Sequence, residues 1–419
     1  MKIISLLLIK KNIIILLLSG FPFLAPGQDR KATKTNGPCK NEMAQNHKGR
    51  WVKDGDLLFA NKLGSQSEMM KRLDEIHKMF FEVYPEPVGL DLAWHYVIRN
   101  DSFGGKVTTD KTREGVTRHY KSQQAILLAN NYYNVRFYHY VCNYSNNTEI
   151  VGGFPGASDA QLFVWINSFD YFAAITPDAC MRINGYPVGM RQPVQTTWKG
   201  YDMTYNPLST DARSVLIHRK GKLPYIPVTR KQYLDHSIEH LNDMMNEQIK
   251  MQMDIPVRSI EEQEEEKKKK LEKFKKDFGA DPKRLKSAVD YYLAGYKTEQ
   301  EQRDERVKKL TSTSEVLLKE YADELENSRK AGMLDFPAYV LDWHPPQPGL
   351  GGIFVDEKQA GKMLVIENTA YIRKDIPSYA PQFMVVSWYI HGYDPPEAKF
   401  IDAILAKFPM EKLAAMIDR

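Results

Sequence analysis

The run Glu264-Glu-Glu-Lys-Lys-Lys-Lys270 lies near the centre of a helical stretch that extends from Thr229 to Lys330. Glutamates of this run each precede a lysine by four residues, a spacing that stabilises a water-exposed helix by ~0.2–0.5 kcal/mol per pair. A half with strand periodicity precedes the stretch, and a short tail with the same periodicity follows it. The sequence therefore predicts an α+β fold: a mainly antiparallel sheet body with an inserted charged helical hairpin or small helical bundle.

The stretch divides into several predicted helices. Thr229 is a favourable N-cap for the first, Asp281-Pro282 opens the third, and Thr298 with Glu301 forms a capping box for the fourth. Apolar side chains of the last helix step by three and four residues and form a heptad-like seam at Val307, Leu310, Ser314, Leu317 and Tyr321. A single helix cannot bury this seam, so the helices are expected to pack together, or against a second copy as a coiled coil.

Five regions are predicted from these patterns. Residues 1–27 form a signal peptide, 28–55 a loose polar leader, 56–228 a sheet-rich region, 229–331 the helical arm, and 332–419 the closing strands and helix. The tail is too short to hold much core of its own. Its strands are therefore expected to pair with those of the first half, which makes the arm an insertion.

The N-terminus has the pattern of a secretory signal, with lysines at positions 2, 10 and 11, the apolar run Ile13–Leu18 and small residues before position 28. Phe21 stands where a lipoprotein signal would carry its acylated cysteine. We therefore expect export to the periplasm or the extracellular space without a lipid anchor; the alternative is an uncleaved N-terminal anchor. The mature chain is expected to contain no integral membrane segment.

Charge argues against nucleic-acid binding. The net charge of +5 falls to +2 after cleavage, because residues 1–27 carry three lysines and no acidic residue. A nearly neutral chain has no general attraction to nucleic acid.

Three cysteines, Cys39, Cys142 and Cys180, would meet an oxidising compartment after export. Cys142 and Cys180 both lie in strand-like segments and are the predicted disulfide pair, with Cys39 left over in the leader. The alternative is three unpaired thiols.

One metal-site pattern is present, His236-Ser-Ile-Glu239-His240. Histidines four residues apart share one helix face and can chelate zinc, with the glutamate as general base, as in inverted zinc peptidases. Both histidines point away from the apolar stripe of their helix, so two surface histidines without a metal are the alternative interpretation. No catalytic residue and no cofactor is otherwise assigned.

Aromatic residues are concentrated between Asn131 and Tyr144. On a strand, Tyr138, Tyr140 and Tyr144 share one face and could form a platform for a glycan or peptide. The alternative is a strand buried on both faces, since aromatic residues are ordinary strand residues.

Two short segments, Leu223–Leu234 and Ile376–Gln382, resemble segments of secreted proteins from Bacteroidetes-type bacteria. The resemblance supports export and implies no activity.

The resulting expectation is an exported, non-catalytic binding or interaction protein with a protein or glycan partner, which could also self-associate through the helical arm. The alternative is a hydrolase, zinc-dependent through His236, Glu239 and His240. Whether the chain is an enzyme is left open.

Overall fold

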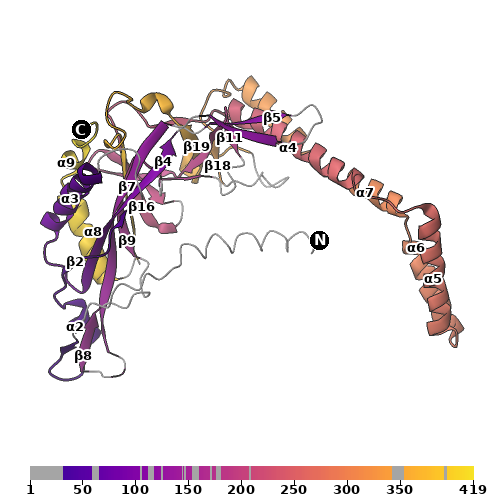
Figure 1. Ribbon diagram of the computed structural model, residues 1–419, viewed down its shortest axis with the longest axis horizontal. Coiled ribbons are helices and arrows are strands. Elements are labelled where there is room, and N and C mark those ends of the chain that lie inside the picture. Colours follow the sequence, from indigo (N-terminus) through magenta and orange to yellow (C-terminus); the bar gives the residue numbers. More distant parts are fainter. Residues whose placement is uncertain are drawn as a thin grey trace.

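The computed structural model places a large sheet between helices and a smaller sheet, and a long helical arm extends from this body (Figure 1). The structure describes the chain from residue 32 to 419, except for residues 59–65, 104–105, 112–117, 124–125, 144, 146–147, 153–159, 170–171, 176–180, 207–208, 342–352 and 391–393. The α+β class with a mainly antiparallel sheet is confirmed. The predicted signal peptide lies outside the described residues.

The large sheet is built around β7 (Ile126–Cys142), which pairs with β4 (Leu90–Phe103) along its whole length. On its other side β7 pairs with β9 (Gln161–Ile166) and β8 (Glu149–Gly152). The order continues from β9 through β20 (Met384–Tyr389), β16 (Ser209–Ile217), β15 (Tyr201–Asn206) and β14 (Val194–Trp198). Strand β20 thus lies between two strands of the first half, which confirms the predicted pairing of the tail.

Helices α3 (Gln66–Val83), α8 (Pro395–Lys407) and α9 (Met410–Ala414) contribute to the core on one face of this sheet. The apolar residues of α3 recur every three or four positions, so Met69, Leu73, Ile76 and Phe80 are all buried. Phe400 of α8 packs against Phe137 of β7, with ring centroids 5.1 Å apart.

A smaller sheet packs against the opposite face through a second core that includes Tyr132, Trp165 and Val385. Its strands are β10 (Ala173–Ile175), β13 (Gly189–Arg191), β19 (Lys362–Glu367), β17 (Tyr225–Pro227) and β18 (Tyr339–Val340). Two hairpins form separate two-stranded sheets: β5 (Lys106–Lys111) with β6 (Arg118–Gln123), and β11 (Arg182–Ile183) with β12 (Tyr186–Pro187). Asn184 and Gly185 both have positive φ, as their turn requires.

The arm leaves the body through α4 (Arg230–Met253) and returns through α7 (Glu299–Lys330), which form an antiparallel stalk. Tyr233 and Tyr321 join the stalk to a third core under the smaller sheet. Its far end carries α5 (Ile260–Phe278) and α6 (Pro282–Gly295), turned across the direction of the stalk (Figure 1). The capping box of Thr298 with Glu301 is present as predicted.

The described part of the leader is folded, contrary to the expectation of a loose segment. It forms β1 (Thr33–Lys34), α2 (Asn41–Gln45), β2 (Trp51–Lys53) and, just beyond, β3 (Leu57–Leu58). Both β2 and β3 pair with β4 in parallel. The low apolar content of the leader did not indicate these elements, because the segment is ordered by pairing with the sheet edge rather than by a large core of its own.

Candidate functional site

The distal hairpin of α5 and α6 buries no apolar side chain. Gln263 is the one buried residue of α5, and no residue of α6 is buried. The helices themselves are well specified: Ser259 forms a capping box with Glu262, and Asp281 accepts hydrogen bonds from the backbone N–H groups of Lys283 and Arg284. The local sequence therefore specifies both helices, but the side chains on their apolar faces are not fully buried.

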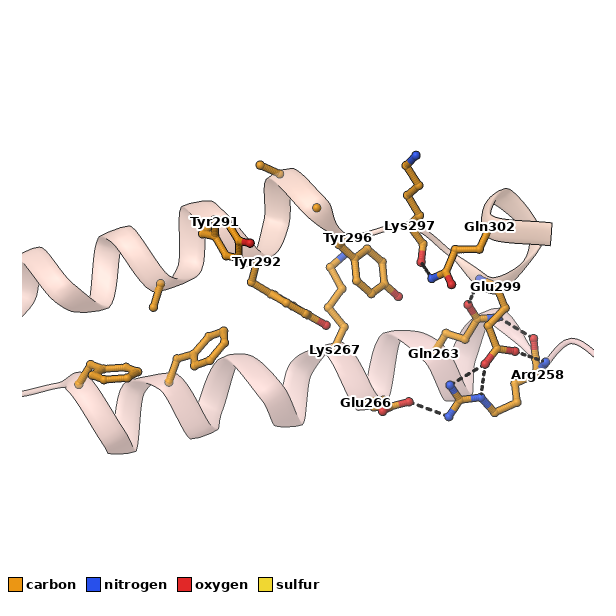
Figure 2. A pocket seen from close by; sticks show the side chains of 15 residues that line it. Arg258, Gln263, Glu266, Lys267, Tyr291, Tyr292, Tyr296, Lys297, Glu299 and Gln302 are labelled. Carbon is orange, nitrogen blue, oxygen red and sulfur yellow. Dashed lines mark hydrogen bonds and ion pairs between the residues drawn. The ribbon is translucent and has the colours of Figure 1, made fainter. Parts of the chain in front are cut away.

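Aromatic side chains line a hollow of about 1080 Å³ in this hairpin (Figure 2). Tyr292 lies edge-on to Phe274, with ring centroids 5.7 Å apart, and Tyr296 lies 5.7 Å from Tyr292. Tyr291 is 85% exposed. Aromatic rings with one wet side are typical of surfaces that bind a partner.

A polar network closes the end of the hollow nearest the stalk (Figure 2). Arg258 donates from Nε to Glu299, 2.7 Å away, and from Nη1 to Glu266, 2.6 Å away. The hydrogen bond from Arg258 lowers the pKa of Glu299. Gln263 connects the start of α5 to the start of α7. Its side chain donates to the Arg258 carbonyl and accepts from the Glu299 N–H. This network fixes α5 against the start of α7.

Charge is unevenly distributed along α5. Residues 261–266 include five glutamates, and residues 267–278 carry seven lysines (267–270, 273, 275 and 276) with the acidic Glu272 and Asp277. The ion pairs from Glu264 to Lys267 and from Glu265 to Lys269 are exposed and contribute little stability. The helix therefore presents an acidic end and a basic end.

A second candidate site lies in the body, where β7 meets the start of α8. His139 Nε2 lies 2.6 Å from Glu397 Oε1, and His139 Nδ1 lies 3.2 Å from Asp394 Oδ2. Burial opposes protonation of His139, but the hydrogen bond with Glu397 and the charge of Asp394 outweigh it and raise its pKa. A hollow of about 200 Å³ adjoins His139 and Asp394.

The first turn of α8 explains the orientation of these carboxylates. Asp394 occupies the N-cap position, yet its side chain makes no capping hydrogen bond. Pro395 and Pro396 follow it, and proline has no N–H to donate. Since a cap bonds the N–H of the second or third helical residue, the second proline removes one of its two usual donors. Asp394 lies against His139 instead.

The predicted tyrosine platform is only partly described. Tyr138 and Tyr140 are half-buried on β7, and Tyr144 lies outside the described residues. The Tyr140 hydroxyl donates to the buried Asp91 over 2.8 Å, and its ring packs edge-on against His47. Tyr140 therefore has the contacts of a packed residue, as the alternative interpretation expects.

The predicted zinc pair lies on α4. The rings of His236 and His240 stack with centroids 5.9 Å apart, and burial together with the charge of His240 lowers the pKa of His236. Both rings are half-buried rather than fully exposed. In the described part of the chain, the group of three ligand side chains that could hold one ion is His139, Asp394 and Glu397, not the group on α4. The α4 zinc site stays a prediction.

The predicted disulfide partner of Cys142 is wrong. Cys142 bonds to Cys39, with Cα atoms 5.7 Å apart. Cys180 lies outside the described residues. The physical reason is that β1 pairs with β8 and β8 with β7, which brings the leader next to the end of β7. Sequence position alone did not indicate this neighbourhood.

Neither candidate site was identified from the sequence. The available signal for the hollow was the apolar stripe of Leu285, Val289 and Tyr292 on α6, with Tyr291 beside it. For the body site the signal was Asp394-Pro-Pro-Glu397, a helix start with one carboxylate at its N-cap and one in its first turn. Comparison with protein-family models, with curated proteins and with solved structures finds no match. In the described part of the chain, no helix combines the length and the apolar character needed to cross a membrane.

Proposed function

We propose that this chain is an exported, non-catalytic interaction protein that associates with a second copy through its distal hairpin. The observation that carries the proposal is the pair α5 and α6, which exposes Tyr291, leaves its other aromatic side chains half-buried and fully buries none. Two amphipathic helices need further helices to bury their apolar faces. The hairpin of a second copy supplies them and completes a four-helix bundle.

Other exposed apolar side chains lie at the same end of the arm, and they favour this end as the contact surface. They are Met251, Met253, Ile255, Ile260, Tyr291 and Leu293. Large apolar patches on a protein surface mark interaction sites. The stalk holds this patch away from the sheet body, so a partner can approach it without contacting the body (Figure 1).

The charges of α5 favour a second copy as the partner. A twofold axis perpendicular to α5 makes the two α5 helices antiparallel, so the acidic end of each faces the basic end of the other. About the midpoint of the helix at residue 269, Glu265 lies opposite Lys273 and Glu262 lies opposite Lys276. Such complementarity selects the partner and its orientation.

Light scattering on the full mature chain tests the association. We expect a mass twice that of one chain. Tyr291→Ala should raise the dimer dissociation constant at least about tenfold, because an exposed tyrosine at the centre of an interface is a typical hot spot. Val316→Ala removes an exposed apolar side chain from α7, outside the hollow, and should leave the constant unchanged.

A charge exchange gives a sharper test. The variant Lys273→Glu/Lys276→Glu and the variant Glu262→Lys/Glu265→Lys should each be monomeric, and an equimolar mixture should dimerise. Circular dichroism of each variant controls for loss of the helices. A monomeric wild-type chain, or a mixture that stays monomeric, overturns the proposal. Mass spectrometry of the secreted N-terminus tests export separately; a retained Met1 contradicts cleavage.

A further inference from the structure

The cluster of His139, Asp394 and Glu397 combines three metal-ligand side chains from segments far apart in the chain. Each residue offers one ligand atom, and the three atoms lie within 4.8 Å of one another. His139 comes from β7, whereas Asp394 and Glu397 come from the start of α8. The two short distances, 2.6 Å from Nε2 to Glu397 and 3.2 Å from Nδ1 to Asp394, involve different nitrogens of the His139 ring, so one ion can bind both carboxylates only after one of them moves.

We propose that these three residues bind one zinc ion. An imidazole nitrogen among the ligands favours zinc over calcium or magnesium, which prefer oxygen alone. The charge balance agrees, since two carboxylates and a neutral imidazole sum to −2, which a divalent cation compensates. This site is independent of the arm and of its proposed association.

The site is more buried than an ordinary surface ion pair. The side chain of Glu397 is 1% exposed and that of His139 is 13% exposed. A buried carboxylate is costly unless it is paired or bound to a metal. Here two acidic side chains, Asp394 and Glu397, both carry this cost of burial, and only the one imidazole of His139 lies between them.

One ion binds only one ring nitrogen, and Nε2 is the better candidate. Its neighbour Glu397 is held in the helix and enclosed, whereas the side chain of Asp394 is 34% exposed and makes no capping bond. Zinc at Nε2 therefore requires the Asp394 carboxylate to turn from Nδ1 toward the ion. The three ligands occupy three of the four positions that zinc prefers.

His139 and Asp394 line the hollow of about 200 Å³, whose other walls include Asn41, Gln45 and Cys142 and which offers room for a fourth ligand. Zinc sites with three protein ligands and one open position bind water or another small ligand there. The disulfide holds α2 at this wall, since Cys39 lies just before α2 and Cys142 ends β7. The structure thus supplies both the ligands and room for an exchangeable one.

Zinc titration of the chelator-treated full chain by calorimetry tests the site. We expect one zinc ion per wild-type chain. Asp394→Asn and Glu397→Gln should each weaken binding at least about tenfold, because each replaces a ligand carboxylate. The double variant His236→Gln/His240→Gln removes the pair on α4 and should bind zinc like the wild type.

Asp394→Asn keeps the test valid if Glu397→Gln fails to fold, because the Asp394 side chain is partly exposed. Cobalt substitution gives a second readout: the visible absorption of a four-coordinate cobalt ion should appear with the wild type and disappear with Asp394→Asn. No zinc binding by the wild type at 1 mM zinc (~4 kcal/mol of binding free energy) overturns the proposal. Zinc lost from the α4 double variant but retained by Asp394→Asn also overturns it.

Discussion

Gly89 decides how closely α2 and α8 approach the start of β4. Its φ is +78°, and an added Cβ would lie 2.4 Å from the Gln45 carbonyl oxygen and 2.5 Å from Pro396 Cγ. Only glycine adopts this conformation without strain and leaves this space open. Gly89 therefore helps to place α8, and with it Asp394, against β7.

Gly89→Ala should lower the free energy of unfolding by more than backbone strain alone, which costs about 1 kcal/mol. Gly200→Ala is the matched control, because Gly200 has a similar φ of +87° with no atom within 4 Å of the added Cβ. Urea unfolding of both variants measures the difference. We expect Gly89→Ala to be less stable by at least about 1 kcal/mol, since overpacking adds to strain; equal losses would contradict the steric argument.

His95 should make the fold sensitive to acid. It is 4% exposed, and burial, followed by the charge of Arg136, lowers its pKa from 6.5 to about 4. Between these values the unfolded chain binds a proton that the folded chain does not. The free energy of unfolding should therefore fall as pH decreases from 6.5 toward 4, by up to about 1.4 kcal/mol per pH unit.

His95→Gln should reduce the slope of the free energy of unfolding against pH by the equivalent of up to one bound proton. Urea unfolding at pH 7, 6 and 5 measures this slope. His240→Gln, on the arm, should leave most of the slope in place. His77 contributes in the same direction, because burial lowers its pKa to about 4 as well. An unchanged slope in His95→Gln would show that His95 titrates normally in the folded chain.

At the scale of elements, the disulfide holds α2 and β1 against the end of β7. It closes a long loop, with a sequence separation of 103. A cross-link of this span reduces the conformational entropy of the unfolded chain, and its removal typically costs 2–5 kcal/mol (about 4.7 kcal/mol in the chain-entropy model). The small core around Cys39, Ala44 and Ile150 depends on the same cross-link.

Cys39→Ser should therefore lower the melting temperature in non-reducing buffer, with thermal unfolding followed by circular dichroism. Addition of a reductant should lower the melting temperature of the wild type toward that of the variant. The variant itself should show no response to reductant. A wild-type chain that is equally stable with and without reductant would contradict a stabilising role for this bond.

The helices of the arm illustrate what local sequence specifies. The caps at Thr229, Asp281 and Thr298 lie where the sequence predicts them, because a cap depends only on residues three or four positions apart. The packing of the predicted seam, by contrast, depends on residues that are distant in the sequence. Leu317 and Tyr321 pack within the chain against α4, whereas Val307 and Leu310 are half-buried farther along the stalk.

At the scale of the whole molecule, the arm is inserted between strands that share the same sheets. β19 follows the arm and pairs with β17 and β13, which precede it. The body therefore does not depend on the arm for its sheet pairing, and the arm can extend far from it (Figure 1). This arrangement suits an element that contacts something other than its own body.

The sequence by itself determined the α+β class, the long charged helices with their caps, and the pairing of the tail with the first half. The class and the helices depend on periodicity and short-range contacts, which a single sequence displays, and the pairing of the tail follows from a tail too short to form its own core. Tertiary structure decided the Cys39–Cys142 bond, the order within the leader, the hollow of the distal hairpin and the meeting of His139 with Asp394 and Glu397. Each of these joins residues tens to hundreds of positions apart, and their proximity depends on strand order and helix docking.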